Sequence, residues 1–340
     1  MGLAGHPCNT AVWSTLDGPY NSPVLAELIT IMTFPTRLSR REFIKTLVAL
    51  GTTALVPATR AASQAPLISK PIPSSDEAMP VIGLGSSRTF NVGDKIAARN
   101  TCTEVIRHFL DAGGRMIDSS PMYGSSQPVI GYALNKLGRS SEVFSADKVW
   151  ISAPSKGQQQ MEASRQYWGV TGFDLMQVHN LVSWQAHLET LYEMKAAGDI
   201  RYVGITTSHG RRHKEFEKVM KNHDLDFVQL SYNLVDREAE RRLLPLAAER
   251  GIAVIVNRPF QRGDLIDRLE GHPLPGWASE IGCINWPQFL LKFIVSHPAV
   301  TCAIPATSQV EHVKENMGAC YGELPSAEMR ARMIGYIENL

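Results

Sequence analysis

The strongest constraint on the fold of this chain is a regular alternation of short apolar runs with longer segments of helical character. The short runs, which suit strands, lie near residues 81–84, 115–118, 143–151, 175–179, 202–205, 227–231, 253–256 and 300–304. The helical segments that follow them lie near residues 96–112, 128–137, 160–168, 184–197, 211–223, 238–250, 286–296 and 309–320. Repeated strand-plus-helix units predict a parallel sheet, and eight of them close a (β/α)8 TIM barrel.

The length of the chain fits one such α/β barrel preceded by other material. A barrel of this kind needs about 250 residues, and residues 79–340 supply that number with little left for insertions. Residues 326–339 predict one extra C-terminal helix after the eighth unit. Residues 64–78 are rich in proline and serine, and we interpret them as a linker.

A targeting signal precedes the linker. Residues 39–45 (SRREFIK) carry a twin-arginine motif, and a modestly apolar stretch at 46–58 is followed by small residues. This order is typical of an exported bacterial precursor, so we interpret residues 32–63 as a twin-arginine signal peptide. It predicts the twin-arginine export machinery as a partner and the periplasm as the location of the folded protein.

The first residues fit neither a signal nor a packed core. Residues 1–31 carry proline, asparagine, glycine and tryptophan without a period, and they precede a region that normally begins a signal peptide. Met32 supplies a better start. We therefore interpret 1–31 as an upstream mis-assigned start.

The bulk composition argues against several classes of function. The formal net charge is +1, whereas a nucleic-acid surface needs a basic patch or stripe. No apolar run reaches the length of about 20 residues that spans a bilayer, so we expect no stable membrane anchor. The five cysteines show no metal-ligand spacing, and we expect buried thiols and no bound metal.

Four polar residues stand at the ends of neighbouring predicted strands or just beyond them. Asp118 ends the second strand, and Tyr123 lies in the loop that follows it. Lys148 lies in the third strand, and His179 ends the fourth. Residues in these positions of a parallel barrel converge on one face. A tyrosine beside a lysine and a histidine can deliver a proton, because the ammonium charge favours phenolate and lowers the tyrosine pKa.

Short motifs stand in a fixed order from about residue 79 to the C-terminus. They are VIGLGS at 81–86, MIDSSPMYGS at 116–125, the lysine at 148, QVHN at 177–180, IRYVGIT at 200–206, AIPATS at 303–308 and the Glu-Asn pair at 315–316. In this order they resemble the aldo/keto reductase family, whose members are (β/α)8 barrels.

The resemblance implies NAD(P)H-dependent reduction of a small-molecule aldehyde or ketone to an alcohol. Tyr123 would donate the proton, and Lys148 and Asp118 would adjust the pKa of Tyr123. His179 would orient the substrate carbonyl. Asp147 precedes the lysine where the family usually has a small or hydroxyl residue. Because neighbouring side chains alternate across a strand, we expect Asp147 to point to the opposite side from Lys148. We take the enzyme to be a monomer.

The resemblance also implies a set of residues that bind the cofactor. Asn180 and Gln229 would hold the nicotinamide carboxamide, with Thr206 where the family commonly uses serine. One position departs from the family, because Asn257 stands where an aromatic side chain often stacks on the nicotinamide. Phe260 could substitute for that aromatic ring. The remaining positions are those of the first βα turn, the pyrophosphate and the adenosine end: Gly85, Ser86, Arg258, Thr307, His312, Glu315 and Asn316.

The choice between NADPH and NADH depends on the cation that faces the 2′-phosphate. The family often uses a lysine and an arginine there, and this chain has Ala306 and His312 in those places. Histidine loses its proton near neutral pH. We therefore expect NADPH as the cofactor by a narrow margin, with NADH also possible.

Two other hypotheses come from different classes of protein. The first is a nicotinamide-binding sensor or partner subunit with little turnover, which the unusual Asn257 leaves open. The second is a barrel lyase or hydrolase that uses Asp118 and His179 with a metal. No further histidine or carboxylate at ligand spacing supports the metal enzyme.

Overall fold

The structure is a computed structural model that describes residues 66–340. The predicted signal peptide at 32–63 and the segment 1–31 lie outside the described residues. Within residues 66–340, no helix is both long enough and apolar enough to cross a membrane.

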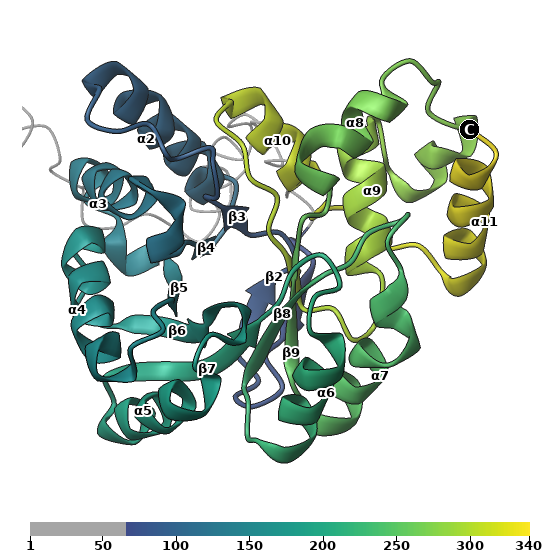
Figure 1. The fold of residues 1–340 in the computed structure, drawn as a ribbon. Helices are drawn as coiled ribbons and strands as arrows, with labels where there is room; N and C mark the ends of the chain where they lie inside the picture. The colour runs from purple at the N-terminus through teal and green to yellow at the C-terminus, as the bar shows by residue number, and fades with distance from the viewer. Residues whose placement is uncertain (1–65) are drawn as a thin grey trace, which may run out of the picture. The chain divides into compact units, whose positions relative to one another are not determined.

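Eight parallel strands form one sheet that closes on itself (Figure 1). Their order around the sheet follows the chain, from β3 to β10. The strands are β3 (Leu84–Gly85), β4 (Met116–Asp118), β5 (Phe144–Val149), β6 (Phe173–Val178), β7 (Ile200–Thr206), β8 (Phe227–Ser231), β9 (Ala253–Asn257) and β10 (Cys302–Ala303). The predicted (β/α)8 barrel is confirmed.

The closing seam of the barrel joins the first of these strands to the last. Gly83 N donates to Ala303 O at 2.8 Å, and Gly85 N donates to Pro305 O at 3.0 Å. A side chain at Gly85 would bring its Cβ to 2.8 Å from Ile304 O. Glycine is therefore required at this position, because the two backbones approach each other too closely for any other residue.

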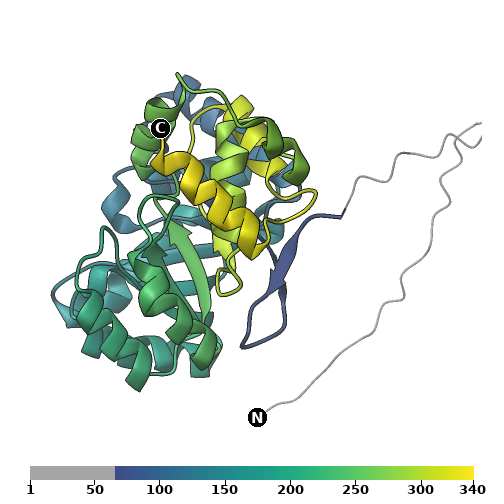
Figure 2. The ribbon, with the colours of Figure 1, turned by 90° about the vertical axis from the view of Figure 1, so that its right-hand side faces the viewer.

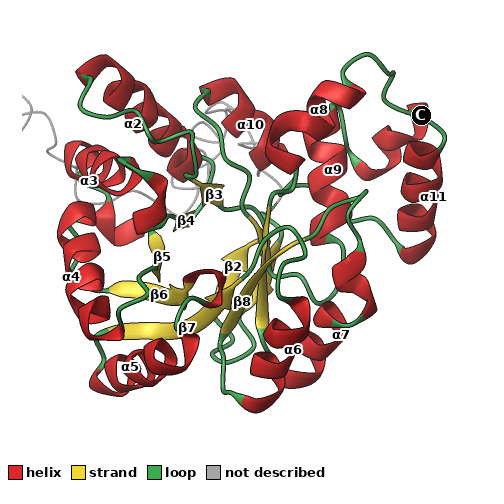
Figure 3. Ribbon diagram, viewed as in Figure 1, coloured by secondary structure: helices red, strands yellow, loops and turns green. Residues whose placement is uncertain are grey.

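Helices form a layer around the outside of the barrel (Figure 3). They are α2 (Ile96–Asp111), α3 (Ser126–Leu137), α4 (Gly157–Trp168), α5 (Trp184–Ala197), α6 (His213–Asn222), α7 (Leu243–Arg250), α8 (Asp264–Leu269), α9 (Trp286–Val295), α10 (Val310–Gly318) and α11 (Ala327–Glu338). Helix α11 is the predicted extra C-terminal helix. Helix α8 lies in the loop after β9, where no helix was predicted.

Alternation of side chains along each strand separates the two halves of the core. In β5, Phe144 and Ala146 point inward and pack with residues of the other strands, whereas Val149 packs in the outer layer against the helices. The inward positions near the C-terminal end of the barrel carry polar groups instead, among them Asp118 and Lys148, both buried. The polar residues of the site are thus built on the rigid inner wall of the barrel.

The linker predicted for residues 64–78 is wrong over part of its length. Strands β1 (Ser69–Pro71) and β2 (Ala78–Pro80) pair antiparallel as a hairpin (Figure 2). Ile72 and Met79 are fully buried and belong to the cluster inside the barrel. That cluster includes Phe144 and Tyr202 near the beginnings of their strands, so the hairpin closes the end of the barrel opposite the polar residues.

Two predicted helices also differ in extent. The helix predicted at 238–250 is broken into a short 3-10 helix, Glu238–Arg241, and helix α7. The helix predicted at 160–168 begins earlier, because α4 starts at Gly157. Both differences lie at helix beginnings, where the apolar period that guided the prediction is weakest.

Candidate active site

A buried ion pair lies below the polar end of the barrel. Lys148 Nζ is 2.6 Å from Asp118 Oδ2 and 2.7 Å from Oδ1, and it donates to Ser119 O at 2.6 Å. These acceptors satisfy an ammonium that has no contact with solvent. Burial alone would lower the pKa of Lys148, but the charge and hydrogen bonds of Asp118, together with the charges of Tyr123 and Asp147, outweigh it and hold that pKa above its usual value. The lysine therefore keeps its positive charge.

Tyr123 lies between this ion pair and the cavity. It ends the short 3-10 helix Pro121–Tyr123, and its ring centroid is 5.3 Å from Lys148 Nζ. Sequence alone suggested that the lysine lowers the tyrosine pKa. In the structure burial raises the pKa of Tyr123 more than Lys148 lowers it, and the carboxylates of Asp118 and Asp147 also raise it. The phenol is therefore protonated and can serve as an acid.

His179 stands beside the tyrosine with its own orientation fixed. The two rings meet edge to face with centroids 5.8 Å apart. Burial, with a smaller effect from Lys148, lowers the pKa of His179 to about 3, so the imidazole is neutral. Its Nδ1 lies 2.8 Å from Ser120 Oγ, which also accepts the Met122 N–H. Among the described residues the hydroxyl of Ser120 has no other acceptor, so it donates to Nδ1 and leaves a proton on Nε2.

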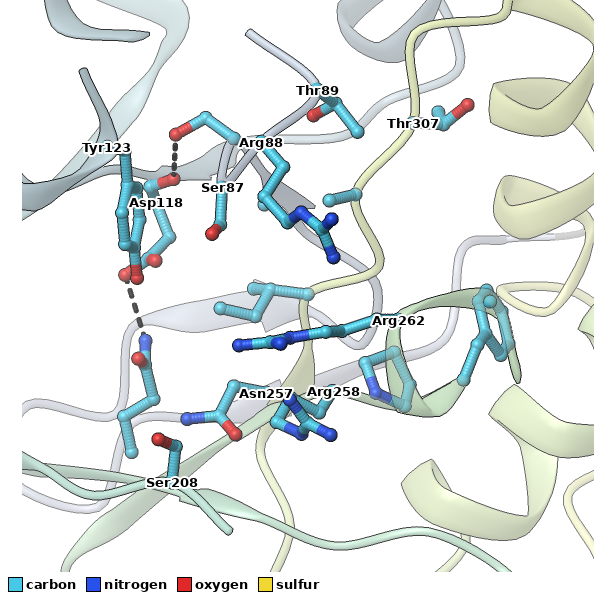
Figure 4. A pocket seen from close by; sticks show the side chains of 18 of the residues that line it. Ser87, Arg88, Thr89, Asp118, Tyr123, Ser208, Asn257, Arg258, Arg262 and Thr307 are labelled. Atoms are coloured by element: carbon cyan, nitrogen blue, oxygen red, sulfur yellow. Dashed lines mark hydrogen bonds between the residues drawn. The ribbon is translucent and has the colours of Figure 1, made fainter. Parts of the chain in front are cut away.

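One cavity of about 590 Å³ opens at this end of the barrel (Figure 4). Asp118, Tyr123 and His179 line it, whereas Lys148 lies behind them. It is also lined by all twelve residues predicted to bind the cofactor: Gly85, Ser86, Asn180, Thr206, Gln229, Asn257, Arg258, Phe260, Thr307, His312, Glu315 and Asn316. The structure thus brings these residues together, and their individual roles stay predictions.

Several of these residues hold one another at the floor of the cavity. Gln229 Nε2 donates to Asp118 Oδ1 at 2.9 Å, which Figure 4 draws as a dashed line. Thr206 Oγ1 accepts the backbone N–H of Asn180 at 3.0 Å. These contacts fix amide and hydroxyl groups beside Tyr123, in positions where a carboxamide could exchange hydrogen bonds with them.

Asn257 does not present a face for stacking. Its Oδ1 accepts from Ser231 Oγ at 2.7 Å, and its Nδ2 donates to Thr207 O at 2.9 Å. The side chain is therefore tied between the ends of β7 and β8. This arrangement explains how the barrel accommodates a residue that departs from the family's aromatic one.

Sequence reasoning missed two of the arginines around the cavity, Arg88 and Arg262, whereas the third, Arg258, was among the predicted cofactor-binding residues. Arg88 and Arg262 line it and point into it from the loops after β3 and β9 (Figure 4). The buried Nη1 of Arg258 has no hydrogen-bond partner. Burial, followed by the charge of Arg262, lowers the pKa of Arg258. The only signal in the sequence was arginine in loops that follow barrel strands, which is also common on solvated surfaces.

The cavity suits a nicotinamide dinucleotide. Amides and hydroxyls near Tyr123 match a carboxamide, and the arginines match a diphosphate, since the unpaired guanidinium nitrogen of Arg258 can donate a hydrogen bond to a phosphate oxygen. Among residues 66–340, no group of three or more histidine, cysteine, aspartate or glutamate side chains is placed to hold a metal. A parallel barrel with this pocket and with a buried lysine–carboxylate pair behind a tyrosine defines a barrel oxidoreductase.

Comparison with known proteins shows to which family the chain belongs. Residues 81–333 match the model of the aldo/keto reductase family. The chain is 27% identical over 263 residues to methylglyoxal reductase YeaE of Escherichia coli (strain K12), covering 75% of this chain and 90% of that protein. It is 27% identical over 244 residues to the NADH-specific methylglyoxal reductase of the same organism, covering 61% and 72%.

A solved structure agrees with these relatives. The aldo-keto reductase from Klebsiella pneumoniae in complex with NADPH is 25% identical and superposes with a TM-score of 0.67, covering 79% of this chain and 95% of that one. The chain belongs to the aldo/keto reductase family. It is an NAD(P)H-dependent oxidoreductase that acts on carbonyl groups.

Proposed function

We propose that Tyr123 is the acid that protonates the carbonyl oxygen in the reduction that this family performs. When bound, the cofactor supplies a hydride from its nicotinamide ring. The observation that carries the proposal is the Lys148–Asp118 pair behind the tyrosine ring. As the phenolic proton leaves, the ammonium of Lys148 stabilises the negative charge that develops on Tyr123.

His179 positions the carbonyl for this transfer. Its Nε2–H can donate a hydrogen bond to the carbonyl oxygen, because Ser120 occupies Nδ1. The neutral ring does not compete with Tyr123 as an acid. The two side chains therefore have separate roles, with one orienting and polarising the carbonyl and the other supplying the proton.

The proposed substrate is a small aldehyde or ketone. Two relatives are named as methylglyoxal reductases, which supports a small carbonyl compound. We propose NADPH as the preferred cofactor by a narrow margin. Thr307 and His312, whose Oγ1 and Nδ1 are 3.3 Å apart, stand at the beginning of α10, where backbone N–H groups favour a phosphate. We also propose that the enzyme acts as a monomer.

One set of measurements tests this function. The purified protein is titrated with NADPH and with NADH at pH 6 and pH 8, and turnover is followed over a panel of aldehydes and ketones that includes methylglyoxal. We expect turnover with both cofactors and a narrow preference for NADPH. Cofactor binding without turnover over the whole panel would instead support a sensor. A large NADPH preference that is equal at both pH values would assign the phosphate to an arginine such as Arg262.

We propose further that the protein is exported folded to the periplasm by the twin-arginine route. The support is the sequence motif at 39–45 and the weakly apolar stretch behind it. Replacing Arg40 and Arg41 with lysine should trap the precursor in the cytoplasm, whereas translation from Met32 should suffice for export. Cell fractionation measures both, and normal periplasmic amounts of the double-lysine variant would contradict the proposal.

A further inference from the structure

A second carboxylate is buried next to Lys148, on the opposite face of β5. Asp147 is fully buried on the outer face of β5, between the barrel and the helices. Its Oδ1 accepts the backbone N–H of Lys148 at 2.7 Å. Its Oδ2 accepts from Trp168 Nε1 at 2.6 Å and from Gln127 Nε2 at 2.9 Å. As expected from strand alternation, it points away from the ammonium of Lys148, which is paired with Asp118 on the inner face.

These contacts connect the segment that carries Tyr123 to the strand that carries Lys148. Gln127 lies in the first turn of α3, four positions after Tyr123. The same amide also donates to Ser164 Oγ of α4 at 2.8 Å. Asp147 therefore joins the beginning of α3 and the end of α4 to the backbone of Lys148.

The charge of Asp147 is not neutralised by a cation of its own. Helices α3 and α4 face it with the neutral groups of Gln127, Ser164 and Trp168. The N–H donors favour a carboxylate, whereas burial opposes it and raises the pKa of Asp147 to about 7. Above neutral pH the site thus holds two carboxylates, Asp118 and Asp147, for one lysine.

We propose that Asp147 is a positioning residue that sets the pH range over which Tyr123 can donate its proton. The inference rests on the proposed function of Tyr123. The titratable groups around the phenol are Asp118 from β4, Lys148 and Asp147 from β5, and His179 after β6, whose imidazole is neutral. Lys148 favours the phenolate, and the two carboxylates disfavour it. Asp147 thereby keeps Tyr123 protonated, as an acid requires, in spite of the ammonium beside it.

The test is the pH profile of kcat/KM for carbonyl reduction in Asp147→Asn. Removing the negative charge makes the phenolate easier to form, so the alkaline limb should move to lower pH. We expect a shift of about one pH unit, the size of a charge effect across a protein interior with an effective dielectric constant of about 20. Asp147→Ser also removes the charge, and it introduces a residue of the small or hydroxyl kind that the family usually has there, so it should move the limb in the same direction. It serves as the second variant in case Asp147→Asn folds poorly.

Ser164→Ala is the matched control. It removes a hydrogen bond from the same cluster without changing any charge, so its alkaline limb should stay where that of the wild type lies. Asp147 variants that melt at lower temperature but keep the wild-type limb would overturn the proposal, because a merely structural residue behaves in that way. A wild-type protein without turnover, or a Tyr123→Phe variant with normal turnover, would instead contradict the proposed function itself.

Discussion

At the scale of single residues, the orientation of His179 depends on one hydroxyl. Ser120 Oγ lies 2.8 Å from Nδ1 and leaves Nε2–H for the proposed hydrogen bond to the carbonyl oxygen. Its neighbour Ser119 is equally buried, but the Ser119 hydroxyl has no hydrogen-bond partner. Of these two adjacent serines, only Ser120 forms a hydrogen bond with the imidazole.

This difference gives a prediction at the residue scale. Ser120→Ala should lower kcat/KM several-fold, up to about tenfold, because a lost hydrogen bond of this kind costs about 0.5–1.5 kcal/mol. Ser119→Ala should have no such effect, since it removes an unpartnered hydroxyl. Steady-state kinetics measures kcat/KM for both variants. Equal values for the two would contradict the proposal that Ser120 orients His179.

Sequence predicted which residues gather at the site, but not how they act on one another. Asp118 and Lys148 could be placed because each stands near the end of a strand, where period and position determine the inward direction. Arg88 and Arg262 could not, because their directions depend on loop backbones with positive φ, at 69° and 70°. The acid strength of Tyr123 could not be predicted either, since it depends on burial as well as on charge.

At the scale of elements, the hairpin of β1 and β2 is the part that composition misrepresents. Prolines and serines around it are typical of a linker, yet Ile72 and Met79 fill the end of the barrel. Their partners, such as Phe144 and Tyr202, are far away in sequence. A pattern within the segment itself could not have revealed contacts with residues so far away in the sequence.

The hairpin makes a prediction about stability. Ile72→Ala should lower the free energy of unfolding by about 2–5 kcal/mol, because it opens a cavity in a closed core. Ile96→Ala, at a position 58% exposed, should change it by no more than about 0.5 kcal/mol. Denaturant unfolding measures both, and cofactor affinity should stay normal since the hairpin lies at the far end of the barrel. An Ile72→Ala protein as stable as the wild type would show that the hairpin does not belong to the fold.

At the scale of the whole molecule, the residues that close the apolar core and the residues of the active site lie at opposite ends of the barrel. One end is closed by apolar side chains of the hairpin, and the other carries the cavity, the ion pair and the arginines. The alternation of strands and helices was enough to predict that the polar residues gather at one end, because the ends of parallel strands meet on one face. The hairpin that closes the other end was not predicted. The extra helix α8 was missed, since its six residues are too few for an apolar period to be recognised.

The central claim, that Tyr123 donates the proton, is tested most directly by Tyr123→Phe. The control is Tyr192→Phe, which removes another phenolic hydroxyl that has no hydrogen-bond partner in the structure. Carbonyl reduction and cofactor affinity are measured for both variants. We predict that Tyr123→Phe lowers kcat by at least about 10²-fold while its affinity for NADPH stays normal, because only the positioned acid is lost. A folded Tyr123→Phe protein that binds NADPH and reduces carbonyls at the rate of the Tyr192→Phe protein would contradict the account.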